Sequence, residues 1–348
     1  MAITLTPKKQ GPRRNFLLRT AAILTAAALG LTACGGDDDA QDAGGDAEGA
    51  GDQGTEFLTI ATGGSSGVYY QVGATFSDIL SDELGSDSSV QATGASAENI
   101  NLLTDNNAEL AFTMGDANAQ ALEGTGPFEG DARDGLTAIA GLYMNTVQVV
   151  ATADSGIETI EDLADRNVAV GDVGSGVELN AQLVLEAHGM SYDDLNEDYL
   201  SYAEATDQMA NGHIDAAFVT SGVPNPSLTE LGTSTDFIIV PITGEGKENL
   251  LNDYDFFLED EIPGDTYQQS EPVETVGVMN HLMVSSELSE DAVYDITRVF
   301  FENLDAIHNS HAAAQDITLE EATEGLTVPL HPGAERYLEE NGVDVSGD

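Results

Sequence analysis

The sequence is poor in basic residues, cysteine and proline, and each shortage excludes something. There are 10 lysines and arginines against 62 aspartates and glutamates, so the formal net charge is −52. A surface of this charge repels nucleic acid phosphates, which excludes DNA or RNA binding. Cys34 is the only cysteine, so no disulfide can form within the chain. The 10 prolines beside 37 glycines indicate many tight turns and no collagen-like repeat.

What the sequence does contain is enough apolar material for a folded protein. Hydrophobic residues make up 41% of its 348 residues, so the chain is long enough for two ordinary domains with real cores. Five of the ten basic residues precede Cys34 and no acidic residue does, so removal of that segment leaves a charge of 5 − 62 = −57. Near-molar salt shortens the screening length to roughly 3 Å and relieves the resulting repulsion. We therefore expect a halophilic protein that works at high salt.

The first 33 residues are predicted to be a twin-arginine lipoprotein signal peptide. Arg13 and Arg14 precede an apolar stretch, and Leu31-Thr32-Ala33-Cys34 resembles a bacterial lipobox. We expect lipidation at Cys34 and attachment to the outer face of the cytoplasmic membrane. Residues 34–56 are rich in Gly and Asp and predict an acidic tether rather than a folded element.

From residue 57 onward, short apolar runs alternate with amphipathic stretches, which predicts an α/β fold with a mostly parallel sheet. Two long extended runs, Val147–Ala153 and Thr275–Val284, divide this pattern. We therefore predict two α/β lobes joined by long hinge strands, with ligand bound between them. The first lobe is predicted to comprise residues 57–148 and 275–348, and the second residues 149–274. The expected strands are 57–61, 89–93, 110–114, 137–143, 147–153, 168–170, 198–201, 215–219, 237–240 and 275–284, and the expected helices are 68–84, 97–103, 177–188, 203–211, 226–231 and 289–301, with further helical material to 324.

One glycine-rich turn follows the first expected strand and opens a helix. It consists of Gly63, Gly64, Ser65, Ser66 and Gly67, followed by Val68 and Tyr69. Glycine lets the backbone approach a ligand closely, and the unpaired N–H groups of a helix start attract an anion. A simple tight turn is the alternative. The turn also satisfies the G-x-S-x-G pattern of a hydrolase with Ser65 as nucleophile, although no earlier strand and loop supply an oxyanion hole. No lysine follows the last glycine, so the turn is not a P-loop.

A second turn of this kind runs from Gly171 to Val177 and contains Gly174, Ser175 and Gly176. Its glycines do not match the dinucleotide-binding spacing, and no cofactor is expected. Two such helix starts, one in each lobe, would hold a small carboxylate from both sides. The six histidines suggest no metal site, because His308 and His311 lack a further ligand at a clear spacing.

Three polar residues follow expected strands, where a side chain can either stabilise the local fold or contact a ligand. Ser96 is either a helix cap or a ligand contact. Asn99 lies one turn further along the same helix, where its side chain could turn toward the ligand. Asp116 follows the strand 110–114, where it would accept a hydrogen bond from a ligand ammonium group or cap the next helix.

Five segments together resemble the TAXI-type solute-binding proteins of tripartite ATP-independent periplasmic (TRAP) transporters. They are Ile60–Tyr70, Thr93–Asn99, Val168–Gly176, Gly212–Phe218 and Pro329–Ala334. The resemblance implies a type II periplasmic-binding fold that delivers glutamate, glutamine or another small carboxylate to an ion-gradient-driven membrane permease, whose small and large subunits we expect to be fused. By motif, its ligand-binding residues would be Gly63, Gly64, Ser65, Ser66, Gly67, Val68, Tyr69, Ser96, Asn99, Asp116, Tyr143, Gly174, Ser175, Gly176, Val177, Gly222 and Pro224.

The chain departs from that family's pattern at three positions. Asn145 stands where the family commonly has glutamate, Val177 replaces a threonine, and Gly115 replaces a serine. No arginine falls in a pocket motif, so we expect the carboxylate to be held by backbone N–H and hydroxyl groups. The leading expectation is a non-enzymatic solute-binding protein. The alternatives are a sensory lipoprotein that presents its ligand to a signalling partner and a serine hydrolase that uses Ser65.

Overall fold

The computed structural model describes residues 54–346, which lie in one compact unit. The predicted signal peptide, Cys34 and nearly all of the tether lie outside these residues. Among the helices of residues 54–346, none combines the length and the apolar character needed to cross a membrane.

One sheet of ten strands organises the described residues, and its main order is β2-β1-β3-β10-β4-β7-β5-β6. Pairing is parallel at both ends of this order and antiparallel where β10 and β4 meet each other and their neighbours. The sheet is therefore mixed, and the prediction of a mostly parallel sheet is wrong at its centre. The strands are β1 (Phe57–Ala61), β2 (Asp87–Gln91), β3 (Leu110–Met114), β4 (Thr137–Thr152), β5 (Asn167–Ala169), β6 (Asn196–Asp198), β7 (Ala216–Ser221), β8 (Phe237–Val240), β9 (Phe257–Ile262) and β10 (Val273–Val284).

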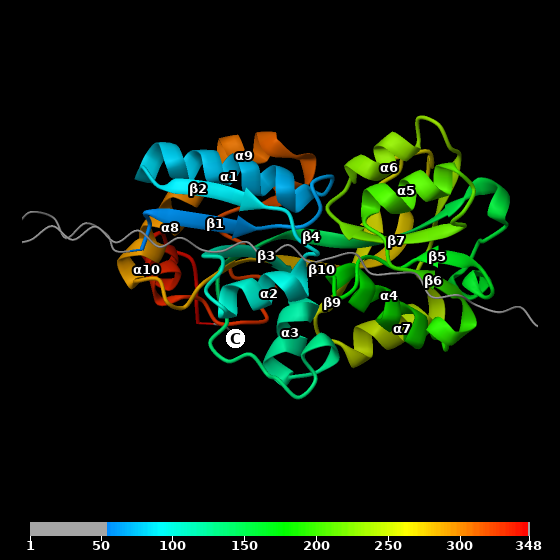
Figure 1. Ribbon diagram of the computed structural model, residues 1–348, viewed down its shortest axis with the longest axis horizontal. Coiled ribbons are helices and arrows are strands. Elements are labelled where there is room, and N and C mark those ends of the chain that lie inside the picture. The colour runs from blue at the N-terminus through cyan, green and yellow to red at the C-terminus, as the bar shows by residue number, and fades with distance from the viewer. Residues whose placement is uncertain (1–53, 347–348) are drawn as a thin grey trace, which may run out of the picture. The chain divides into compact units, whose positions relative to one another are not determined.

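Helices cover both faces of the sheet in two groups (Figure 1). We call β1–β3 with α1–α3 and α8–α10 the first lobe, and β5–β8 with α4–α7 the second lobe. The helices are α1 (Val68–Leu84), α2 (Ser96–Thr104), α3 (Gly115–Glu123), α4 (Gly176–Ala187), α5 (Tyr202–Ala210), α6 (Pro226–Leu231), α7 (Gly244–Asp253), α8 (Glu290–Glu302), α9 (Leu304–Ser310) and α10 (Pro332–Glu340).

Strand alternation explains which helices cover which face. In β3, Leu110 and Phe112 pack into the cluster that contains α1 and α8, whereas Ala111 packs with α2 and α3. The same alternation in β5 directs Val168 toward α4 and Ala169 toward α5. Because successive side chains of a strand point to opposite faces, each lobe has a core on both sides of the sheet.

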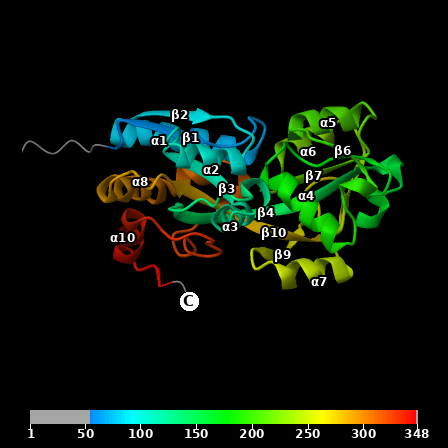
Figure 2. The same ribbon diagram turned by 60° about the horizontal axis from the view of Figure 1, so that its bottom comes forward.

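The long strands β4 and β10 join the two lobes, and both views show them between the two groups of helices (Figures 1 and 2). They pair with each other, and each contributes buried residues to the cores of both lobes. The predicted lobe boundaries at 148/149 and 274/275 fall inside these two strands. The exact division of the chain remains a prediction.

Candidate functional site

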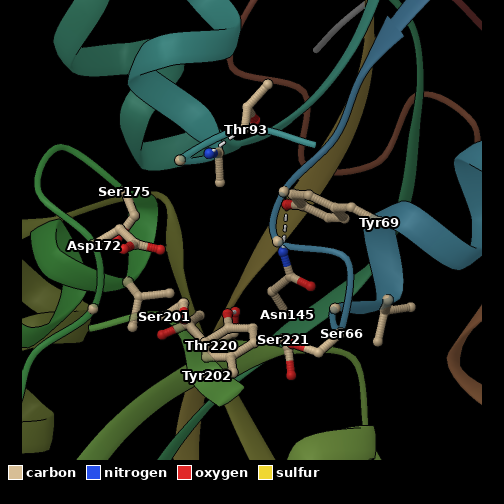
Figure 3. A pocket seen from close by; sticks show the side chains of 18 of the residues that line it. Ser66, Tyr69, Thr93, Asn145, Asp172, Ser175, Ser201, Tyr202, Thr220 and Ser221 are labelled. Atoms are coloured by element: carbon tan, nitrogen blue, oxygen red, sulfur yellow. Dashed lines mark hydrogen bonds between the residues drawn. The ribbon is translucent and has the colours of Figure 1, made fainter. Parts of the chain in front are cut away.

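A cleft between the two lobes collects the ends of several strands and the starts of α1, α4 and α5 (Figure 3). Its free volume is about 50 Å³. One water molecule needs roughly 10–15 Å³ measured in this way, so the cleft admits only a small ligand in this arrangement. The residues that line it are Gly63, Gly64, Ser66, Gly67, Val68, Tyr69, Thr93, Gly94, Ala95, Met114, Asn145, Gly171, Asp172, Ser175, Val177, Leu200, Ser201, Tyr202, Thr220 and Ser221.

The start of α1 offers unoccupied N–H groups to this cleft. The preceding turn is closed by a hydrogen bond from the Gly67 N–H to the Gly64 carbonyl oxygen, 2.8 Å long. Gly67 is the N-cap residue and has no side chain to cap the helix. The N–H groups of the first helical turn therefore have no acceptor within the helix, and the positive end of the helix dipole points to the same place. This start suits an anionic group of a ligand.

The start of α4 is different, because the chain's own side chains already occupy it. Ser175 Oγ accepts a hydrogen bond from the Glu178 N–H at 3.1 Å, as a helix cap does. The Glu178 carboxylate in turn accepts from the Gly174 N–H at 3.4 Å. Gly171 and Gly174 have φ values of +98° and +73°, which favour glycine. Like the first turn, this one is closed by a hydrogen bond to the carbonyl oxygen three residues earlier, from the Ser175 N–H to Asp172 at 2.9 Å. Part of its anion-binding capacity is, however, already used.

Asp172 brings negative charge into the cleft from the second lobe. It is half-buried, and burial raises the pKa of its carboxyl group, with smaller contributions from Glu204 and Glu98. No hydrogen bond or ion pair to this carboxylate occurs within residues 54–346. The basic residues of that range do not line the cleft.

The floor of the cleft carries two buried oxygen atoms that have no partner among the described residues: Oδ1 of Asn145 and Oγ1 of Thr220. Each of these residues is 1% exposed. Asn145 Nδ2 donates to the hydroxyl of Tyr69 at 2.6 Å. Figure 3 shows Asn145 and Thr220 below the opening between Asp172 and Tyr69. Buried polar atoms in native proteins are nearly always satisfied, so these two point to a ligand or to water in the cleft.

The lobes touch beside the cleft through three contacts. The Ala97 N–H of α2 donates to the Gly174 carbonyl oxygen at 3.3 Å. A Cβ atom on Gly176 would lie 2.6 Å from Met114 Sδ, so α4 begins directly against the first lobe. Asn180 Nδ2 of α4 donates to Asp116 Oδ2 of α3 at 2.8 Å, and both side chains are fully buried. The structure therefore has the lobes in contact beside a small cleft that is open to solvent.

Several residues predicted to bind ligand do line the cleft: Gly63, Gly64, Ser66, Gly67, Val68, Tyr69, Ser175 and Val177. The other predicted residues lie outside its lining: Ser65, Ser96, Asn99, Asp116, Tyr143, Gly174, Gly176, Gly222 and Pro224. Some of these support the lining from behind. Ser96 Oγ accepts from the Met114 N–H, and a Cβ atom on Gly222 would meet Ala313 Cβ at 2.5 Å and the Tyr143 ring. A ligand contact by any of these residues remains a prediction.

Sequence reasoning missed Tyr202, Thr220 and Ser221, and it did not name Asn145 or Asp172 as ligand-binding residues. A signal for the first was present, because Ser201 and Glu204 form a capping box at the start of α5. The Tyr202 hydroxyl donates to the Thr220 carbonyl oxygen at 2.7 Å, which holds its ring against the end of β7. Thr220 and Ser221 are the last two residues of that strand, where ligands bind in α/β sheets.

Asn99 holds the backbone of the first lobe in place behind the cleft. Its amide donates to the carbonyl oxygens of Thr62 at 2.5 Å and Phe112 at 2.7 Å, and its oxygen is 2.7 Å from Thr93 Oγ1. Replacing Asn99 with alanine removes three buried hydrogen bonds, and only Thr62 among the two carbonyl groups keeps another side-chain donor, Thr93 Oγ1. Each lost hydrogen bond costs about 0.5–1.5 kcal/mol. We expect Asn99→Ala to lower the unfolding free energy by roughly 2–4 kcal/mol, measured by denaturant titration in molar salt. A loss below about 0.5 kcal/mol, as for an ordinary surface substitution, contradicts this role.

Asp116 should make stability depend on pH. Burial raises the pKa of its carboxyl group to about 7. The folded protein then holds this proton more tightly than the unfolded chain, so the stabilisation is complete below about pH 4 and is lost as the pH rises to about 7. Asp116→Asn keeps a neutral side chain at every pH. At pH 8 we expect this variant to be more stable than the wild type by roughly 4 kcal/mol, with a much smaller gain at pH 5.

Thermal and denaturant unfolding at both pH values measure this difference. Asp207→Asn is the matched control, because Asp207 is exposed on α5. If Asp116→Asn is no more stable than the control at pH 8, the buried carboxyl group does not have the assigned effect.

A protein-family model described as the NMT1-like family matches residues 60–342. Among solved structures, PhnD1 from Prochlorococcus marinus (MIT 9301) in complex with methylphosphonate is 13% identical, with 82% of this chain and 98% of that chain covered and a TM-score of 0.52. A structure described as a periplasmic transporter is 14% identical, with 82% and 92% covered and a TM-score of 0.51. The periplasmic aliphatic sulphonate binding protein SsuA from Escherichia coli is 15% identical, with 82% and 83% covered and a TM-score of 0.46.

These comparisons confirm the predicted two-lobed, periplasmic-binding-protein-like α/β fold. They correct the predicted family. The match is to the NMT1-like family, so the assignment to TAXI-type proteins of TRAP transporters is wrong. The physical reason lies in the motifs that suggested it. Glycine-rich turns from strand to helix are a general solution for binding anions, and they do not distinguish one family with this fold from another.

Proposed function

We propose that this chain, which belongs to the NMT1-like family, is an extracytoplasmic solute-binding protein that delivers a small organic anion to a membrane transporter. The observation that carries the proposal is the uncapped start of α1, whose N–H groups open into a cleft between two lobes. The solved relative PhnD1 is described as a complex with methylphosphonate, itself a small anion, which supports the proposal.

The proposed ligand is a small carboxylate, such as an amino acid of the glutamate or glutamine type or a dicarboxylate. Backbone N–H groups at α1 would hold its anionic group without an arginine, since no arginine lines the cleft. The free volume of about 50 Å³ is too small for a bulky compound. Ligand would select or stabilise the arrangement in which the lobes touch, and the transporter would recognise that closed arrangement.

The proposed location follows from the sequence before the described residues. A twin-arginine signal would export the folded protein, and lipid on Cys34 would hold it at the outer face of the cytoplasmic membrane. Binding of ligand in that compartment requires no catalytic group. Ser65, the candidate nucleophile, does not line the cleft and makes no hydrogen bond to a histidine within residues 54–346, which favours a binding role over hydrolysis.

Mass spectrometry of ligand released from natively purified protein tests this proposal. The compounds found should then be titrated calorimetrically in molar salt, together with a panel of amino acids and carboxylates. We expect a small anion to be released and to rebind with one site per chain. If no member of the panel gives heat or a thermal shift, the proposed function is wrong.

A further inference from the structure

The two lobes offer groups of opposite polarity to the cleft. The first lobe presents the N–H groups of the α1 start, which has no cap, and the second lobe presents the carboxylate of Asp172. Resting on the proposed function, we infer that the ligand is a zwitterion whose anionic group lies at α1 and whose ammonium group lies at Asp172. Asp172 is then the residue that selects ligands with a protonated amine.

The helix starts of the second lobe do not compete for the anion. At the start of α4, the Ser175 hydroxyl accepts from the Glu178 N–H, and the Glu178 carboxylate accepts from the Gly174 N–H. At α5, Ser201 and Glu204 form a reciprocal capping box, with Glu204 accepting from both the N–H and the hydroxyl of Ser201. Both starts therefore carry a carboxylate of their own. A second carboxylate, from a ligand, would be repelled there.

Asp172 has no protein partner for its charge. Figure 3 shows its carboxylate directed toward the middle of the cleft, across from Tyr69 and Asn145. The carboxylate has neither a hydrogen bond nor an ion pair within residues 54–346. Closing the lobes over a ligand removes water from this carboxylate, and a desolvated carboxylate is either protonated or paired with a charge of the opposite sign. An ammonium group supplies that charge, whereas a second carboxylate increases the repulsion.

The floor of the cleft also suits an ammonium group beside Asp172. An ammonium group has three N–H donors and no acceptor. Besides Asp172, the cleft contains the unpartnered oxygen atoms of Asn145 and Thr220, both nearly completely buried. These are oxygen acceptors within the same small space, and no basic side chain is present to occupy them. Of the two ligand types left open above, the amino acid therefore fits and the dicarboxylate does not.

Matched pairs of compounds test this inference, because the members of a pair differ only in the amino group. We would titrate L-glutamate against glutarate and L-alanine against propionate with wild-type protein, Asp172→Asn and the control Asp207→Asn, in the lowest salt that keeps the protein folded. One hydrogen bond to a charged group raises affinity by a factor of about ten to a hundred. We expect at least one amino acid to bind more tightly than its deaminated partner by that factor. Asp172→Asn should remove this preference, and it should raise the affinity for the deaminated acid because the repelling carboxylate is gone.

The outcomes separate this inference from the function on which it rests. Equal or tighter binding of the deaminated acids to wild-type protein overturns the zwitterion and leaves an anion-binding protein. The zwitterion is also overturned if Asp172→Asn binds amino acids with the same affinity as Asp207→Asn. Unliganded melting temperatures show whether each variant is folded. If folded wild-type protein binds no member of either pair, and no other carboxylate or amino acid, the proposed function fails and the inference with it.

Discussion

Replacing Gly64 with aspartate should reduce ligand affinity on the order of a hundredfold while leaving the protein folded. Gly64 lines the cleft in the turn before α1, and a Cβ atom at this position would meet no atom within 4 Å. The new carboxylate would occupy the positive end of the α1 dipole and repel the anionic group of the ligand. Juxtaposed like charges cost several kcal/mol, and each 1.4 kcal/mol is tenfold in affinity.

Gly64→Asn is the matched control for this change, because it has the same shape without the charge. We expect Gly64→Asn to bind nearly as tightly as wild-type protein in calorimetric titrations. We also expect the unliganded melting temperature of Gly64→Asp to be unchanged or raised, since an acidic side chain near a helix start is stabilising. Equal affinities of Gly64→Asp and Gly64→Asn would show that no anion binds at α1.

Replacing Gly176 with valine should prevent the lobes from closing. It should weaken ligand binding at least as much as Gly64→Asp does. Gly176 begins α4 in the second lobe, and its Cβ position lies 2.6 Å from Met114 Sδ and 3.0 Å from Ser96 Oγ of the first lobe. The branched side chain of Gly176→Val cannot fit unless the two helix starts move apart. The ligand then loses its contacts to one lobe, and we expect affinity to fall by a factor on the order of a hundred or more.

Gly176→Ala distinguishes steric blocking from a general effect of losing the glycine. Its single methyl group meets the end of the flexible Met114 side chain, which can move aside. We expect Gly176→Ala to lose ligand affinity modestly and Gly176→Val to lose it strongly. For both variants we expect small changes in the unliganded melting temperature. Small-angle scattering should show compaction on ligand addition for wild-type protein and none for Gly176→Val. Unaltered affinity of Gly176→Val would mean that the lobes bind ligand without making this contact.

The sequence predicted the elements of the fold where local patterns decide the outcome. The bounds of β1, α1, β3, α6 and β8 agree with those expected, since each has clear periodicity and punctuation at its ends. The helices α3, α7 and α10 and the strand β9 were not among the expected elements. The exposed faces of α7 and α10 are strongly polar, and their apolar faces become apparent only against a neighbour. The antiparallel centre of the sheet was missed for another reason. The direction in which β10 pairs depends on where the chain returns, which no local pattern encodes.

The candidate site was predicted in part, and the limit is physical. Glycine, serine and a helix start in sequence identify a turn such as Gly63–Tyr69, and that turn does line the cleft. The pattern does not show whether the helix start is free. Gly67 leaves α1 uncapped, whereas Ser175 and Glu178 satisfy α4, and this difference depends on side-chain contacts. Thr220 and Ser221 carry no motif, because their place in the cleft comes from the end of a strand.

A crystal structure of the protein with the ligand it retains through native purification tests the account most directly. We expect one small molecule between the lobes, with an anionic group accepting hydrogen bonds from the first-turn N–H groups of α1 at Val68 and Tyr69. A ligand bound outside the cleft, or one that leaves these N–H groups without an acceptor, would contradict it.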